Sequence, residues 1–153
     1  MATTHLAGAE QLHAAVGRHL GYSDWLTLNQ QRIDEFAAAT GDHQWIHVDA
    51  ERAAAGPFGT TIAHGYLTLS LSNFFLPQIV EVTGFAMGVN YGTNKVRFVA
   101  PVPVGSRIRA GAQLTDVAEV AGGLQTTMVV TIDIEGAGRP ACVIESISRW
   151  LFS

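Results

Sequence analysis

The segment from His64 to Val80 most constrains the fold, because its apolar residues fall on almost every side of a helix. A helix that is apolar all round is one that other structure surrounds. The segment is too short to span a membrane, and Pro77 is expected to end or kink it near Leu76. We therefore expect a buried central helix. Its apolar residues are Tyr66, Leu67, Leu69, Leu71, Phe74, Phe75, Leu76 and Ile79.

The half of the chain after this helix is typical of β-structure. β-Branched and aromatic residues concentrate in segments 86–99, 107–117, 125–134 and 141–151. Gly- and Pro-containing turns separate these segments, and no helical pattern intervenes, so the strands should pair mainly as antiparallel neighbours. The order of elements predicts an α+β fold in which an antiparallel sheet curls around the central helix.

Two shorter helices are expected before the central one. Residues 9–19 carry apolar side chains at helical spacing, and so do residues 29–40. Asn29 is one candidate cap for the second helix, and Thr27 with Gln30 in a capping box is the other. Residues 51–55 have the length of a single helical turn.

A carboxylate and an imidazole lie where the second helix should end. Asp42 and His47 are separated by about 500° on a continuous helix, so their side chains would point about 140° apart. They can act together only if the chain leaves the helix. Gly41 is a suitable stop, because glycine accepts the left-handed conformation that ends helices. On an irregular segment after a rigid helix, the two residues are a candidate acid/base pair.

Composition limits the class of protein. A chain of 153 residues that is 48% hydrophobic fits one globular domain, residues 1–153. The net charge of −4 comes without any basic run, so we expect no nucleic-acid partner. The single cysteine, Cys142, lies in an apolar run, which favours a small buried side chain over a nucleophile.

The chain carries no pattern that directs it to a membrane or out of the cell. Residues 1–21 lack the charged and then apolar pattern of a signal peptide, and no stretch approaches the roughly 20 apolar residues of a membrane span. We expect a cytoplasmic protein with no membrane partner.

Several motifs together resemble one known family. Residues 40–47, Thr-Gly-Asp-His-Gln-Trp-Ile-His, continue to Arg52-Ala53 and are followed by Ile-Ala-His-Gly-Tyr at 62–66. This combination resembles the MaoC-like dehydratase family, which includes the (R)-specific enoyl-CoA hydratases. Residues 95–105 are similar to the sheet region of that family. The resemblance implies a hot-dog fold, in which a sheet wraps around one long central helix, usually as a homodimer.

The resemblance also implies a reaction that needs no cofactor. It is the hydration of a trans-2-enoyl-CoA to the (R)-3-hydroxyacyl-CoA, together with the reverse dehydration. Water must be oriented at C3, C2 must receive a proton, and the thioester oxygen must carry enolate-like charge. Asp42 and His47 match the family's acid/base pair. Gly65 matches the residue whose backbone N–H, at a helix start, stabilises the charge.

Each of these residues also has a purely structural interpretation. Asp42 alone would serve as a turn residue at a helix end, and His47 as a packing histidine. His64 lies beside the helix start and either orients the loop or borders the substrate. Asp42, His43, Asp49 and His64 offer metal-binding atoms, but their spacing matches no standard ligand set, so we expect no metal.

The chain departs from the family pattern at two positions. Many members carry Asn-Pro where this chain has Gln44-Trp45, so Trp45 is expected to fill space near the acyl pocket. Several hydratases have a serine two helical turns beyond the His-Gly pair, where this chain has Asn73. Asn73 still donates and accepts hydrogen bonds, which leaves it an auxiliary polar role toward the substrate.

Few Lys and Arg side chains are grouped closely enough to bind the phosphates of CoA. Lys95 and Arg97 would share one face of a strand, which makes them candidate CoA-binding residues. Arg107 and Arg109 form the other close pair. Surface ion pairs with Asp or Glu are an equally good explanation for these cations.

Two further functions stay open at this stage. A hot-dog thioesterase usually carries an acidic residue on the central helix, and residues 66–80 contain none. A hot-dog protein without catalysis would bind acyl thioesters or stabilise a partner enzyme, since a fold does not fix a function. In each case the open edge of a small sheet favours a dimer.

Overall fold

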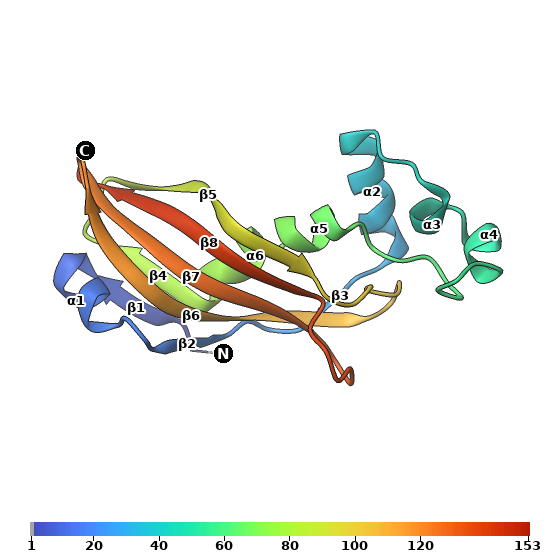
Figure 1. Ribbon diagram of the computed structural model, residues 1–153, viewed down its shortest axis with the longest axis horizontal. Helices are drawn as coiled ribbons and strands as arrows, with labels where there is room; N and C mark the ends of the chain where they lie inside the picture. Colours follow the sequence, from blue (N-terminus) through green and yellow to red (C-terminus); the bar gives the residue numbers. More distant parts are fainter. Residues whose placement is uncertain (1) are drawn as a thin grey trace.

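The central helix lies against a curved sheet in the computed structural model, which describes residues 2–153 (Figure 1). The helix consists of α5 (Gly65–Ser70) and α6 (Ser72–Ile79), which meet at Leu71. Pro77 lies inside α6, which continues to Ile79, so the helix does not end near Leu76; the alternative expectation, a kink there, stays a prediction. Proline only removes one hydrogen bond there, and the fully buried side chain of Ile79 holds the last turn in the core.

An antiparallel sheet forms the second layer. Its strands follow the order β2-β6-β7-β8-β5, and each neighbouring pair is antiparallel, as the sequence predicted. The short strand β3 pairs with β6 beside this path. A sheet against one long central helix is the hot-dog architecture. The bounds are β2 (His19–Tyr22), β3 (Leu26–Thr27), β5 (Met87–Phe98), β6 (Arg107–Val120), β7 (Gly123–Ile134) and β8 (Cys142–Leu151).

The N-terminal region differs from the prediction. Helix α1 (Gly8–Ala14) ends earlier than the predicted 9–19, and His19 already belongs to β2. Gly17 explains the difference, because it has a φ of +89° and donates its N–H to Leu114 O, which turns the chain into the sheet. Strands β1 (Thr4–Ala7) and β4 (Val80–Thr83) form a parallel pair that the sequence pattern did not reveal.

One face of the central helix builds the core. Leu67, Leu71, Phe75 and Ile79 recur at intervals of four and pack against buried residues of β6, β7 and β8. The opposite face is open: the side chain of Tyr66 is 69% exposed. The expectation that other structure surrounds the whole helix therefore holds, within this chain, for one face only.

Three helices gather at one end of the molecule, beyond the start of α5 (Figure 1). They are α2 (Gln30–Thr40), α3 (Trp45–Val48) and α4 (Ala50–Ala54). Asn29 caps α2 by accepting a hydrogen bond from Arg32 N, and Gly41 ends it with a φ of +80°. Both predicted boundaries are confirmed, and Gly41 turns the chain toward the segment that holds Asp42 and His47.

Cys142 is fully buried, as predicted, and burial raises the pKa of its thiol to about 11.

Of the helices in residues 2–153, none has the length and hydropathy that a membrane span requires.

Candidate functional site

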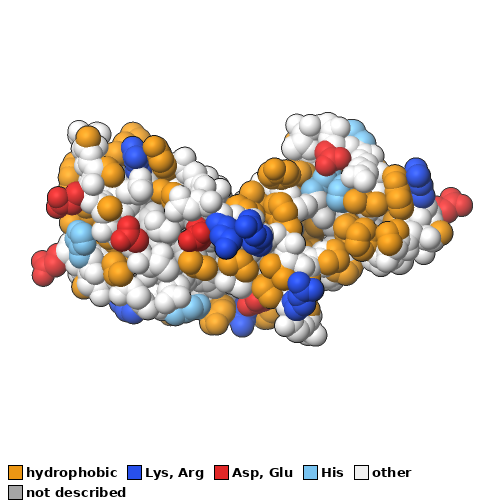
Figure 2. All heavy atoms as spheres, in the orientation of Figure 1, with side chains coloured by type: hydrophobic (Ala, Val, Ile, Leu, Met, Phe, Trp, Pro, Cys, Tyr) orange, Lys and Arg blue, Asp and Glu red, His pale blue; other side chains and the backbone are white. Residues whose placement is uncertain are grey.

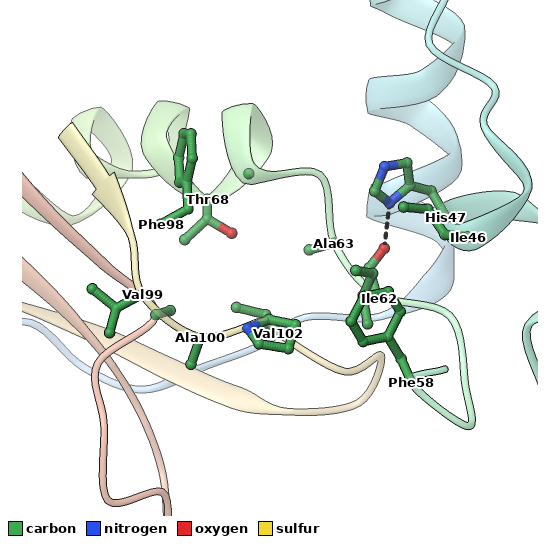
Figure 3. Close-up of a pocket in the computed structure, with 13 residues that line it drawn as sticks. Ile46, His47, Phe58, Ile62, Ala63, Thr68, Phe98, Val99, Ala100 and Val102 are labelled. Carbon is green, nitrogen blue, oxygen red and sulfur yellow. Dashed lines mark hydrogen bonds between the residues drawn. The ribbon is translucent and has the colours of Figure 1, made fainter. Parts of the chain in front are cut away.

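A cavity of about 350 Å³ lies where the helical end of the molecule meets the start of α5 (Figure 3). In Figure 2 this region is a hollow at which histidine side chains meet hydrophobic ones. Most of the lining side chains are apolar, and His47 and Thr68 are the polar exceptions. A largely apolar cavity with few polar groups is typical of small-molecule sites. The lining comprises Ile46, His47, Phe58, Ile62, Ala63, Gly65, Thr68, Phe98, Val99, Ala100, Pro101, Val102 and Ala141.

His47 enters this cavity from α3 and is 6% exposed. Its Nδ1 lies 2.7 Å from Ile62 O. A carbonyl oxygen only accepts hydrogen bonds, so Nδ1 carries the proton and donates it. In the neutral ring Nε2 is then the free acceptor, and Figure 3 shows this nitrogen on the side of the ring away from Ile62.

The surroundings of His47 keep its imidazole neutral. Burial is the largest influence and lowers its pKa from the ordinary value of 6.5, while the hydrogen bond to Ile62 raises it. The nearby His64 lowers the pKa further, and Asp42 raises it. The net effect is a lowered pKa, so at neutral pH the ring can accept a proton at Nε2.

The lowered pKa predicts a pH-dependent stability. Between the folded pKa and 6.5 the unfolded chain binds more protons at His47 than the folded chain does, so stability falls as pH drops through that window. Urea unfolding at pH about 7.5 and about 5.5 measures this loss. In the His47→Asn variant the loss should be smaller. An equal loss in both proteins would contradict the assignment.

Asp42 lies directly after the end of α2, with an exposed side chain. Its Oδ1 accepts a hydrogen bond from Gln44 N at 3.3 Å, and its backbone oxygen accepts one from His64 Nε2 at 3.0 Å. Because Gly41 ends the helix, the chain brings Asp42 back toward His47. One ligand atom each from Asp42, His47 and His64 lie within 4.8 Å of one another.

His64 is the N-cap residue of α5, and its ring is nearly inaccessible, at 2% exposure. The ring stacks on His47 with centroids 3.9 Å apart and an interplanar angle of 24°. Phe36 of α2 packs against it with centroids 4.9 Å apart. Its Nδ1 has no hydrogen-bond partner among the described residues.

The same three side chains, Asp42, His47 and His64, carry atoms that can also bind metal ions. A zinc ion bound at about 2.1 Å would need three ligand atoms within roughly 3.6 Å of one another, whereas these spread over as much as 4.8 Å. A water oxygen can reach atoms 4.8 Å apart at about 2.8 Å, which is hydrogen-bond distance. The arrangement suits a water molecule better, and the absence of a resident metal stays a prediction.

Gly65 is the first residue of α5, so its N–H has no acceptor inside the helix. It lines the same cavity as His47. A Cβ at this position would lie 3.2 Å from three atoms of the Phe98 ring. Glycine therefore leaves the backbone N–H accessible beside a close aromatic wall.

None of the predicted substrate-binding residues lines this cavity, Trp45 and Asn73 included. The ring of Trp45 covers Gly56 and lies 4.4 Å below the Arg52 guanidinium, and it is not among the lining side chains. Asn73 is exposed on α6 and lines two other hollows, one shared with Asn90 and Ser146. Their predicted contact with substrate stays untested.

The predicted cations divide into two groups. Lys95 and Arg97 share a groove on the sheet with Val99 and Glu145, as the strand alternation predicted. Val99 also lines the cavity, so the groove lies next to it. Arg107 instead forms an ion pair with Glu135 at 2.7 Å, and Arg109 stacks on Tyr22 and Trp25.

Of the residues that line the cavity, sequence reasoning named only His47 and Gly65 as site residues, and it missed Phe58, Thr68 and Phe98 among others. Strand alternation carried a signal for Phe98, because it places this side chain opposite Arg97 and toward the helix. Thr68 lies one helical turn after His64, on the side that faces the cavity. No local pattern marked Phe58, which follows Pro57 in a loop.

The chain is similar to several known proteins. The family described as MaoC like domain matches residues 11–135. The 3-hydroxyacyl-thioester dehydratase Z of Mycobacterium tuberculosis (strain ATCC 25618 / H37Rv) is 55% identical over 141 residues, covering 92% of this chain and 93% of that protein. Nodulation protein N of Rhizobium leguminosarum bv. viciae is 48% identical over 143 residues, covering 90% of this chain and 87% of that protein.

A solved structure supports the fold. The (R)-hydratase from A. caviae involved in PHA biosynthesis superposes with a TM-score of 0.74 at 26% identity, covering 88% of this chain and 96% of that chain.

Proposed function

The chain belongs to the MaoC-like dehydratase family, and from this premise we propose that it interconverts trans-2-enoyl-CoA and (R)-3-hydroxyacyl-CoA. The coarser statement, a hydro-lyase acting on 3-hydroxyacyl thioesters, follows from the family and its 55% identical relative. One observation carries the finer proposal: a neutral His47 and the backbone N–H of Gly65 line one apolar cavity, with Asp42 beside them.

In the direction of hydration, Asp42 and His47 hold one water molecule between them. The lowered pKa and free Nε2 of His47 favour the imidazole as the base that takes the water proton. The resulting hydroxide oxygen bonds to C3 of the enoyl thioester. His47, now protonated, delivers that proton to C2, and the carboxylate of Asp42 stabilises the imidazolium in between. Dehydration follows the same steps in reverse.

Charge that develops on the thioester oxygen needs a donor that is already in place. The N–H of Gly65 meets this need, because it lies at the start of α5 with no acceptor in the helix. The positive end of the helix dipole reinforces it. The ring of Phe98 lies beside the same spot and supplies an apolar surface for the acyl chain.

The groove beside the cavity bears on whether the acyl group is carried by CoA or by an acyl-carrier protein. Lys95 and Arg97 are exposed there and have no ion-pair partner among the described residues. Phosphates are ligands for such cations. We assign the groove to the phosphates of CoA, with an acyl-carrier-protein thioester as the alternative. Glu145 pairs in register with Lys95 and would limit the attraction.

A homodimer would cover the open face of the molecule. Strand β5 lies at the edge of the sheet, and 12 residues of its outer backbone edge have no strand partner among the described residues. Exposed Tyr66, Phe74, Val89 and Tyr91 lie on this strand or on the outer face of the central helix. A second copy related by a twofold axis can pair its own β5 along this edge.

The dimer predicts a mass in solution of about twice 16.3 kDa. Tyr91→Asp should shift the protein toward monomer, because a charge would have to be buried at the interface. Val16→Asp is the matched control, since Val16 is an exposed apolar residue outside this face. Sedimentation equilibrium measures both. A monomeric wild-type protein would refute the dimer.

Mixing the protein with 2-enoyl-CoA substrates of increasing chain length tests the proposed activity. The enoyl absorbance should fall with no release of free thiol. Thiol release would identify a thioesterase instead, and tight binding without any absorbance change would identify a non-catalytic binding protein. The dependence of the rate on chain length measures how far the acyl pocket extends.

A further inference from the structure

We propose that His64 is a positioning residue, a buried imidazole that fixes the backbone of Asp42 and the ring plane of His47 so that both reach one water molecule. The inference rests on the proposed hydration chemistry and adds a third residue to it. His64 is not among the residues that line the cavity, and it acts through its two neighbours, His47 and Asp42.

The first contact fixes Asp42. His64 Nε2 lies 3.0 Å from Asp42 O, and because a carbonyl only accepts, Nε2 carries the proton in this ring. Asp42 is exposed and follows a helix that has just ended, so its position depends on such contacts. The hydrogen bond joins the segment after α2 to the start of α5, which are 22 residues apart in the sequence.

The second contact fixes His47. The hydrogen bond to Ile62 O holds the ring of His47 at one atom and still permits rotation about that bond. Stacking on His64, at 3.9 Å between centroids, removes this freedom. Phe36 lies 4.9 Å from His64 and limits its movement in turn. Nε2 of His47 is therefore held in one direction.

The unpartnered Nδ1 indicates that His64 serves positioning and not stability. With Nε2 protonated, Nδ1 is a buried acceptor with no hydrogen-bond partner among the described residues. Burying such a group without a partner is unfavourable, so an apolar side chain would favour the folded state at this position. A histidine that only stabilised the fold would be expected to make hydrogen bonds with both ring nitrogens. A histidine kept for positioning needs only Nε2 and the ring face.

Two substitutions separate positioning from stability. His64→Gln keeps an N–H donor for Asp42 O, whereas His64→Leu removes it. We expect His64→Leu to lower kcat about 10- to 100-fold with little change in KM, because misplacement by about 1 Å has effects of this size. His64→Gln should retain kcat within about fivefold. Phe36→Leu changes only the packing on His64 and leaves both hydrogen bonds, so its kcat measures how much of the effect comes from that packing.

Urea unfolding of the same variants completes the test. His64→Leu should be at least as stable as the wild type, because it eliminates the unpartnered acceptor, and its lost activity then cannot come from unfolding. Wild-type kcat in His64→Leu would overturn the proposal. Equal losses of kcat in the Leu and Gln variants would refute the role of the hydrogen bond to Asp42 O, because the donor would then not matter.

A measurement without turnover keeps the inference separate from the proposed function. Imidazole nitrogen NMR should show Nδ1–H for His47 and Nε2–H for His64 in the wild type. In His64→Leu the amide of Asp42 and the ring of His47 should lose their single sharp signals. If the protein does not hydrate enoyl thioesters but shows these spectra, the function fails and the positioning stands. Unchanged spectra in His64→Leu would refute the positioning itself.

Discussion

Replacing Gly65 by proline should lower kcat/KM by about 100- to 1,000-fold relative to Gly65→Ala, because removing one preorganised donor to a developing oxyanion has effects of this size. Proline removes the backbone N–H and alanine keeps it. Both add a Cβ at the position that lies 3.2 Å from the Phe98 ring, so the ratio between the variants reports the replacement of the N–H by the proline ring. Steady-state kinetics with one enoyl-CoA measures that ratio.

The backbone at this position tolerates proline. Gly65 is the first residue of α5, where the helix makes no use of the N–H. His64, the preceding residue, has φ −60° and ψ 138°, the extended conformation that a residue before proline prefers. Circular dichroism should show both variants folded. Equal kcat/KM in the two folded variants would exclude the N–H of Gly65 from the reaction.

Removing the free nitrogen of His47 should lower kcat by about 100- to 10,000-fold, the usual contribution of a general acid/base group. His47→Asn suits the test, because the amide nitrogen of asparagine can still donate to Ile62 O while nothing replaces Nε2. Asp42→Asn removes the other partner and keeps the shape of its side chain. Single-turnover kinetics with enoyl-CoA measures each loss.

The double variant tells whether the two residues act on one water molecule. When two groups work as a unit, the losses of activity from removing each one do not add. The double variant Asp42→Asn, His47→Asn should therefore have a kcat only slightly below that of the less active single variant. Gln44→Ala is the matched control on the same segment, because the exposed Gln44 side chain makes no described contact with either residue. Losses that multiply would indicate two independent roles. A double variant with wild-type turnover would remove both residues from catalysis.

Local patterns were sufficient for the elements that position the site. Asn29 and Gly41 marked both ends of α2, since caps depend only on neighbouring residues. Alternation and turn residues located β5 to β8 within a few residues, and the apolar segment located the central helix. The motif around Asp42 and His47 depended on a family resemblance, because spacing alone could not show that the chain folds back to bring them together.

The remaining features depend on contacts between distant segments. The pair β1 and β4 joins residues about 75 positions apart, and neither short strand has a strong pattern of its own. His64 was predicted to orient the loop or to border the substrate, and nothing local revealed that it stacks on His47 and bonds to Asp42 O. Trp45 was assigned near the acyl pocket, yet its ring lies between Gly56 and Arg52.

Stereochemistry tests the central claim most directly, because a water held on one side of the cavity can only add to one face of the double bond. The protein is incubated with (R)-3-hydroxyacyl-CoA and, separately, with the (S) isomer. Dehydration is monitored by the appearance of the enoyl absorbance. We predict that the (R) thioester is converted and the (S) thioester is not, and that Asp42→Asn and His47→Asn abolish most of this conversion. Dehydration of the (S) thioester, or of neither, would contradict the proposed function.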